Sequence, residues 1–474
     1  MNAASRREFL GLSGLGFGSL AFAALSAQAS AQASGDRPVA EGPASPFAPR
    51  PPHFPARAKA VIFLFMEGGP SHVDLFDPKP ELTRRHGQPL PASFGTVITP
   101  MGTGRNKLLA SRRKFRKHGR AGIDFSDWLP HMATCADDFA VLRACWADSL
   151  NHVGGVCQMN TGSVLAGRPS LGSWAVYGLG TVNQNLPGFV VLIEGGEVSG
   201  GARNWGSGYM PATYQGTPFR NGPNPVLNLH PPAEVGADRQ RAKRELIARL
   251  NDLHRRDRPP DSQLDARQHA YELAFRMQAS ASEVVDLSRE PERVKEAYGL
   301  NRPETAEMGH RCLLARRLVE RGVRFVQVYC GAGSQWDAHA DIEGNHSRLC
   351  LRADQPTAAL IKDLKARGLL DETLVIWGGE FGRTPMSEGT NGRDHNPYGF
   401  TMLLAGGGVK GGTVHGATDE FGLYGVEGRV HVHDLHATIL HLLGFDHERL
   451  TFRHNGREDR LTDVKGRVIQ EVLA

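Results

Sequence analysis

The chain has 474 residues, enough for about three average domains or one large domain with insertions. Apolar residues make up 40% and charged residues 22%, a composition that excludes wholesale disorder. Fifty-five Lys and Arg against 50 Asp and Glu leave a net charge of +5, which does not require a nucleic-acid partner. The six cysteines form no CxxC pair and are too sparse for a disulfide scaffold or a zinc ribbon, and their pairing stays open.

The N-terminal segment, residues 1–29, has the pattern of a cleaved export signal. The pair Arg6-Arg7 precedes a run of small and apolar residues, 11–25, and Ala27–Ala29 is an A-x-A cleavage site, which is typical of a twin-arginine signal peptide. The alternative is a membrane anchor, but the run is shorter than the ~20 residues that a spanning helix needs. We therefore predict export to the periplasm or the exterior, a Pro-rich linker over 30–57 and no membrane span after cleavage.

The rest of the chain, residues 58–474, contains short apolar runs that predict strands buried on both faces. These runs lie at 60–66, 139–143, 189–193, 323–328, 373–377 and 400–404. Helical spacing of apolar residues occurs between them, at 128–137, 170–177, 305–320 and 347–367. The alternation predicts an α/β fold with a doubly wound, mostly parallel sheet flanked by helices. A charged stretch at about 238–300 interrupts it and is predicted to be a helical insertion.

A run of eight Lys and Arg residues lies between Arg105 and Arg120. The simpler interpretation is a solvated loop, because charge runs usually are solvated. The alternative is a patch that attracts an anionic substrate or polymer. Nucleic-acid binding would rest on this run alone and fits poorly with export, so we expect no nucleic-acid partner.

Polar residues are concentrated where the predicted strands end. Four segments combine carboxylates with His or Arg, and they lie at 67–80, 336–346, 378–384 and 393–396. Ligands of open parallel sheets bind outside the carboxyl ends of the strands. Asp, Glu and His gathered there can bind a divalent cation, which polarises a phosphoryl or sulfuryl oxygen. The alternative for each single residue is a helix cap or a satisfied buried polar group.

Long motifs cover these segments, namely Gly68–Pro80, Glu380–Pro385, Gly392–Pro397, Leu404–Gly412 and His433–Leu440. They resemble the DUF1501 family of secreted bacterial proteins, itself similar to a branch of the alkaline phosphatase and sulfatase superfamily. The resemblance implies an alkaline phosphatase-like α/β fold and a divalent cation, Zn, Mn, Mg or Ca. It also implies an anionic ester substrate, such as a sulfated or phosphorylated glycan.

The metal ligands expected from the residues and the resemblance are, in order of preference, Asp337, His339, Glu380, His395, Glu67 and Asp394. Glu67 ends the first strand, where the superfamily has a metal-binding acid. Glu380 is similar to an acid after a later strand, but Phe381 replaces the His that should follow it.

The nucleophile position departs from the superfamily pattern. It reads His152, and Cys157 lacks the Pro and Arg that follow the cysteine of formylglycine sulfatases. His152 could attack through its imidazole or act as general base for water activated by a metal ion. Arg168 and Arg383 are expected to bind the anion, with an ion pair to a nearby carboxylate as the alternative for each.

These observations predict a secreted metal-dependent hydrolase of phosphate or sulfate esters, including esters on polysaccharides. The alternative is a binding or assembly protein on the same scaffold that has lost hydrolysis. The missing Ser or Thr nucleophile and Phe381 support that alternative. The sequence leaves the substrate, the number of metal ions and the oligomeric state open.

Overall fold

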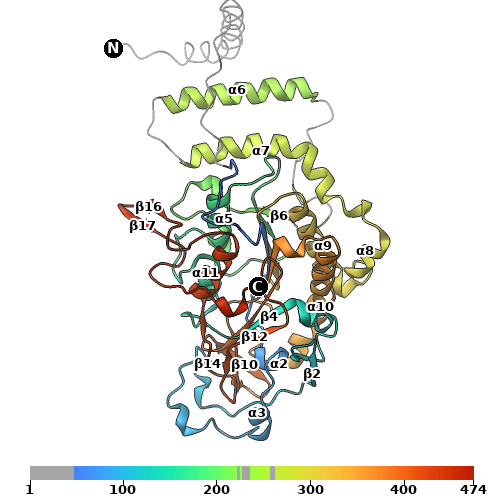
Figure 1. Cartoon of the computed structure of the whole chain (residues 1–474), viewed down its shortest axis with the longest axis vertical. Coiled ribbons are helices and arrows are strands. Elements are labelled where there is room, and N and C mark those ends of the chain that lie inside the picture. The colour runs from blue at the N-terminus through green and yellow to red at the C-terminus, as the bar shows by residue number, and fades with distance from the viewer. Residues whose placement is uncertain (1–46, 221, 223–224, 227–234, 257–261) are drawn as a thin grey trace, which may run out of the picture. The chain divides into compact units, whose positions relative to one another are not determined.

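The central sheet is nine-stranded within the residues that the computed structural model describes, 47–220, 222, 225–226, 235–256 and 262–474 (Figure 1). The strand order is β12-β4-β11-β8-β1-β7-β5-β6, and β15 also pairs with β4. The strands are β1 (Ala60–Met66), β4 (Phe139–Trp146), β5 (Phe189–Leu192), β6 (Thr217–Phe219), β7 (Phe325–Cys330), β8 (Thr373–Gly378), β11 (Phe400–Ala405), β12 (Thr413–His415) and β15 (Val430–His431). The predicted signal peptide and most of the predicted linker lie outside the described residues.

The direction of the strands brings several chain segments to one edge of the sheet. β1 pairs in parallel with β7 and β8, and among the described pairings of this sheet only those of β11 are antiparallel. The chain leaves β8 at its carboxyl end and forms the hairpin β9 (Gly382–Glu388) and β10 (Gly392–Asn396) before it enters β11. The connection therefore stays at the carboxyl edge, and the predicted mostly parallel sheet is confirmed.

Both faces of the sheet are buried under helices. Side chains of a strand alternate between the two faces, so each strand contributes to a cluster on either side. In β1, Ile62 and Leu64 belong to one apolar cluster, whereas Phe63 and Phe65 belong to a second cluster on the other face. The first cluster includes α9 (Pro303–Glu320) and α10 (Ile342–Ala366); the second includes α4 (His152–Thr161), α5 (Leu171–Leu179) and α11 (Val432–Leu442) (Figure 1). The predicted doubly wound α/β architecture is therefore confirmed.

The prediction of an α-helix over residues 128–137 is wrong. The chain forms only a short 3-10 helix, η3 (Met132–Asp138), with a non-helical backbone at Cys135. Pro130 disfavours helical geometry at Leu129, which prevents a helical start at residue 128, and the non-helical backbone at Cys135 interrupts the rest. In contrast, α10 begins earlier than expected, because the side chain of Asp341 caps it by accepting from the N–H of Gly344.

The predicted insertion consists of helices α6 (Ala237–Arg256), α7 (Ser262–Val285) and α8 (Glu292–Ala297), with α6 beside α7 (Figure 1). Within the described ranges, no helix combines the length and the apolar character needed to cross a membrane. All six cysteines are buried free thiols.

Candidate metal centre

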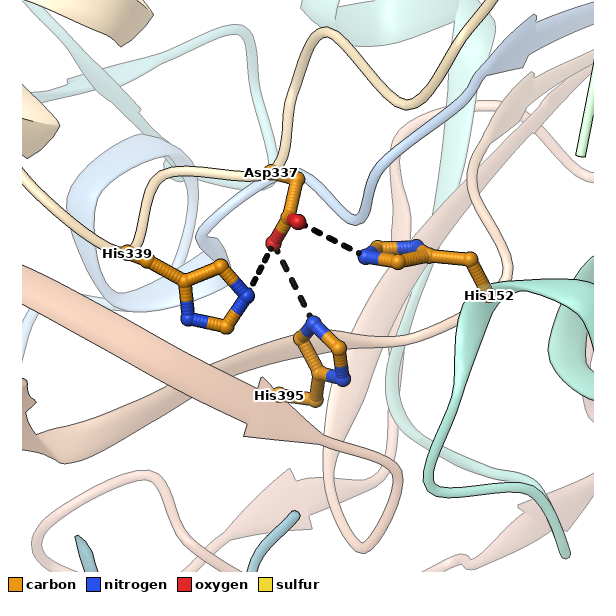
Figure 2. Close-up of side chains that lie close together, drawn as sticks. All are labelled: His152, Asp337, His339 and His395. Atoms are coloured by element: carbon orange, nitrogen blue, oxygen red, sulfur yellow. Dashed lines mark hydrogen bonds and ion pairs between the residues drawn. The ribbon is translucent and has the colours of Figure 1, made fainter. Parts of the chain in front are cut away.

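Four side chains from separate parts of the chain meet at the carboxyl edge of the sheet. Asp337 and His339 lie in the connection from β7 to α10, His395 lies on β10, and His152 is the first residue of α4 after β4. Their ligand atoms all lie within 4.8 Å of one another. Figure 2 shows the three imidazole rings arranged around the Asp337 carboxylate.

The three imidazoles present the same ring nitrogen to this carboxylate. Nε2 of His339 lies 2.9 Å from Oδ1 of Asp337, and Nε2 of His395 lies 3.1 Å from the same oxygen. Nε2 of His152 lies 3.1 Å from Oδ2, a contact without hydrogen-bond alignment. The Nε2 atoms therefore surround one anionic group.

The other ring nitrogen of each histidine is held by an acceptor. Nδ1 of His152 lies 2.7 Å from Oε1 of Glu380, and Nδ1 of His395 lies 2.8 Å from the carbonyl oxygen of Leu150. Nδ1 of His339 contacts the carboxylate of Glu388. Carboxylates and carbonyls only accept, so each Nδ1 carries the proton, an arrangement typical of metal-binding histidines.

This arrangement needs positive charge between the imidazoles and Asp337. A neutral imidazole with its proton on Nδ1 would direct the Nε2 lone pair at an anion, which is unfavourable. Burial alone lowers the pKa of His152, but the carboxylates of Asp337 and Glu380 raise it to about 9. Asp337 likewise raises the pKa of His339. A second proton on each ring, or one shared cation, would satisfy the Nε2 atoms.

The spacing of these atoms fits a shared cation. In a tetrahedral site, zinc–nitrogen and zinc–oxygen bonds of about 2.0–2.2 Å place neighbouring ligand atoms roughly 3.3–3.6 Å apart. The contacts of 2.9–3.1 Å between Nε2 atoms and Asp337 are a few tenths of an ångström shorter than this range. Small shifts of the carboxylate would therefore complete a site with three nitrogens and one oxygen.

Arg383 lies fully buried behind Asp337. Its Nη2 is 2.7 Å from Oδ1 of Asp337, and its other contacts are with the carbonyls of Gly68, Gly69 and Arg393. Burial would raise the pKa of Asp337, but the surrounding imidazoles and Arg383 hold it well below its usual range. Arg383 thus fixes an ionised carboxylate, and its predicted contact with a substrate anion stays a prediction.

Two further buried acids, Glu380 and Glu67, lie beside the centre. Both oxygens of Glu380 accept from the N–H of Gly68, at 3.0 and 3.2 Å. Oε1 of Glu67 accepts from the backbone N–H groups of Ser199 and Ser334, whereas its buried Oε2 has no partner among the described residues. Burial and the charge of Glu380 raise the pKa of Glu67. Oε2 of Glu67 is therefore a buried acceptor without a donor among the described residues.

Of the two remaining predicted residues, Arg168 lies apart from the four, whereas Asp394 offers a carboxylate oxygen within 4.8 Å of ligand atoms of His339 and Glu388, which makes these three a second candidate metal-binding group. Asp394 accepts from the backbone N–H of Met101 and from the hydroxyl of Thr103, so it ties that loop to the residue before His395. Arg168 pairs with Asp463 at 3.3 Å, and none of its contacts in the described part of the chain is with the four. Their predicted roles in metal and anion binding stay predictions.

The start of α4 lies at the centre because Gly154 allows the helix cap and Gly155 allows the helix to approach Glu380 closely. Asn151 caps the helix by accepting from the N–H of Gly154 at 2.9 Å, which fixes the backbone at His152. A Cβ on Gly155 would lie 3.2 Å from Cβ of Glu380. The helix N-terminus also favours a bound anion, since its free N–H groups carry partial positive charge.

Sequence reasoning did not identify Glu388 or the carbonyl of Leu150, and it placed His152 at the nucleophile position, as nucleophile or general base, and not among the metal ligands. Glu388 follows Arg383 in no recognisable motif, and its partner depends on how β9 pairs with β10. A backbone carbonyl such as that of Leu150 has no residue-type signal.

The fold and the geometry define an α/β protein with a candidate metal centre at the carboxyl edge of its sheet. The chain belongs to the DUF1501 family, described as a protein of unknown function, whose model matches residues 58–473.

Similar solved structures include three enzymes. The sulfatase PsFucS1 from Pseudoalteromonas sp. is 13% identical with a TM-score of 0.35, over 83% of this chain and 69% of that one. The lipoteichoic acid synthase LtaP from Listeria monocytogenes is 11% identical with a TM-score of 0.36, over 89% and 78%. The alkaline phosphatase of the Antarctic bacterium TAB5 is 11% identical with a TM-score of 0.31, over 74% and 92%. No curated protein matches the chain.

Proposed function

We propose that the protein is an exported hydrolase of phosphate or sulfate esters that depends on a divalent cation bound by His152, Asp337, His339 and His395. One observation carries this proposal: three Nε2 atoms face one carboxylate while every Nδ1 is held by an acceptor. Three imidazoles and one carboxylate favour Zn²⁺ or Mn²⁺ over Mg²⁺ or Ca²⁺, which prefer oxygen ligands.

A divalent cation held by His152, Asp337, His339 and His395 would polarise a phosphoryl or sulfuryl oxygen and would favour attack by water. The residues of the chain prepare the site for it. Glu380, Glu388 and the Leu150 carbonyl orient the rings, and Arg383 keeps Asp337 ionised and in place. Both nitrogens of His152 are engaged in this arrangement, so we assign it as a ligand and water as the attacking group.

The ester substrate is supported by the anion-binding features of the edge. The N-terminus of α4 lies at the centre, where its partial positive charge stabilises an anionic ester. A second cation held by the unpartnered Oε2 of Glu67 would help to stabilise the charge that develops on the leaving group. The motif resemblance to the alkaline phosphatase and sulfatase superfamily supports the same substrate class.

A second candidate is a binding protein without turnover on the same scaffold. It is supported by the imidazole at the position where a hydroxyl or thiol nucleophile is expected, and by Arg383, whose donors are occupied by protein groups.

The test is metal analysis of the exported protein, followed by turnover of aryl phosphate and aryl sulfate esters. We expect stoichiometric Zn²⁺ or Mn²⁺ and hydrolysis of at least one ester class. His395→Ala should lose both, whereas His254→Ala, an exposed histidine on α6, should retain both. Metal bound at full stoichiometry without turnover would favour the binding protein, and folded protein free of metal would contradict the metal centre.

A further inference from the structure

The basic segment, residues 105–120, begins with a stretch that pairs with β9 beside the candidate metal centre. The N–H of Ser387 in β9 donates to the carbonyl of Lys107 at 2.8 Å, and the N–H of Leu109 donates to the carbonyl of Pro385 at 2.9 Å. Leu108 and Met386 form an antiparallel bridge between these bonds. The segment is therefore ordered against β9 and differs from a freely solvated loop.

The same segment is anchored near two residues of the centre. The amide of Asn106 donates to the carbonyl of Ser387 at 2.8 Å, one residue before Glu388, which holds His339. The preceding loop binds Asp394 through Met101 and Thr103. The backbone at residues 101–109, which carries the start of the basic run, thus contacts segments that hold residues of the metal centre.

Most of the charges of this segment lack ion-pair partners. Arg113 pairs with Glu343, Lys117 with Asp124, and Arg120 with Asp137. The other five cations are exposed and form no ion pair with any residue in the described part of the chain. We call them the basic edge: Arg105, Lys107, Arg112, Lys114 and Arg116.

We propose that the basic edge binds the flanking anionic groups of a polyanionic glycan, a polysaccharide that carries repeated sulfate or phosphate esters, while one ester reaches the metal centre. This inference rests on the proposed ester hydrolysis and adds the substrate class. Five unpaired cations exceed what a single ester anion can neutralise, and exposed positive charge on a segment that pairs with β9 concentrates a polyanion near the site.

A glycan fits the basic edge better than a nucleic acid does. Proteins that bind single strands combine cations with aromatic side chains on which bases stack. Phe115, the one aromatic residue between Arg105 and Arg116, is half-buried. The basic edge therefore offers charge without a stacking platform.

The test compares two triple variants that change the net charge equally. One is Lys107→Glu, Arg112→Glu, Arg116→Glu in the basic edge, and the control reverses three exposed cations of α6 in Arg239→Glu, Lys243→Glu, Arg249→Glu. Fluorescent dextran sulfate and dextran phosphate are the probes, with neutral dextran and single-stranded DNA for comparison.

We expect the basic-edge variant to raise the Kd for dextran sulfate or dextran phosphate at least about tenfold, with the control within about twofold. The slope of log Kd against log salt concentration should also decrease by about three, the value expected when three anion contacts are lost. At matched negative charge per chain, the dextran that binds more tightly identifies the preferred ester type.

Equal losses in both variants, or tighter binding of DNA than of either charged dextran, would overturn the proposal. Binding is measured without turnover, so the outcome is separate from that of the proposed function. A metal-free protein would defeat the hydrolase, yet the two variants would still decide whether the basic edge binds a polyanion.

Discussion

At the scale of single residues, Gly68 fixes where Asp337 lies. Its φ is +116°, and a Cβ on it would lie 2.5 Å from the backbone nitrogen of Asp337 and 2.6 Å from that of Trp336. Its carbonyl also accepts from Arg383 and its N–H donates to Glu380. Glycine is required here for both its backbone conformation and its lack of a side chain.

We predict that Gly68→Ala weakens metal binding by displacing the Asp337 loop. The matched control is Gly87→Ala, where φ is +79° but nothing lies within 4 Å of the added Cβ. Both changes strain the backbone, by about 1–3 kcal/mol. Metal titration should show a loss of affinity only for Gly68→Ala, and equal affinities of the two variants would refute the role assigned to Gly68.

Glu388 is predicted to act through the ring of His339. Glu388→Gln should lower metal affinity about 10–100-fold, the usual effect of losing an acceptor behind a metal-binding histidine. Glu427→Gln, an exposed glutamate, provides the control. Competition with a chelator measures the affinity, and an unchanged value for Glu388→Gln would contradict the orientation of His339 described above.

At the scale of elements, α11 stabilises the C-terminal end of α4, the helix that begins at His152. Nε2 of His436 lies 2.8 Å from the carbonyl of Met159, and Nε2 of His433 lies 2.6 Å from the carbonyl of Gly162. Carbonyls in the last turn of a helix have no partner within the helix, so these histidines satisfy them. Burial lowers the pKa of His436 to about 3.

This pKa predicts acid sensitivity of the fold. The unfolded chain binds a proton at His436 below about pH 6.5, whereas the folded protein does not until about pH 3. The stabilisation is therefore complete above pH 6.5 and declines as the pH falls toward 3. His436→Gln should flatten the dependence by nearly one proton, about 1.4 kcal/mol per pH unit.

Urea unfolding between pH 7 and pH 4 measures this effect, with His254→Gln on the exposed face of α6 as the control. A slope for His436→Gln equal to that of the wild type would contradict the buried neutral state of His436.

Much of this element structure was predictable from the sequence. Unbroken apolar runs such as Ala60–Met66 predicted strands that are indeed buried on both faces. The failure at residues 128–137 came from giving helical spacing more weight than Pro130. In the centre, the geometry groups the expected Asp337, His339 and His395. It adds Glu388 behind them, which pattern could not reveal because the contact depends on the folded hairpin.

At the scale of the whole molecule, the candidate metal centre joins segments that are distant in the chain. His152 follows β4, Asp337 and His339 follow β7, and His395 lies between β8 and β11. A cation bound to all of them exists only in the folded protein, so its binding free energy adds to the free energy of unfolding.

We therefore predict that a chelator lowers Tm. At a free metal concentration about 1,000 times the Kd, binding contributes about 4 kcal/mol to the free energy of unfolding. His395→Ala should start from the lower Tm and show no further shift with chelator. A wild-type Tm that is insensitive to both chelator and added Zn²⁺ would argue against a cation that links these segments.

X-ray absorption at the metal edge tests the central claim most directly, because it reports which atoms surround the ion. The exported wild-type protein should show about three imidazole nitrogens and a carboxylate oxygen at roughly 2.0–2.2 Å. His339→Ala should show one imidazole fewer. A metal bound without imidazole scattering, or the same imidazole count in His339→Ala, would contradict the centre formed by His152, Asp337, His339 and His395.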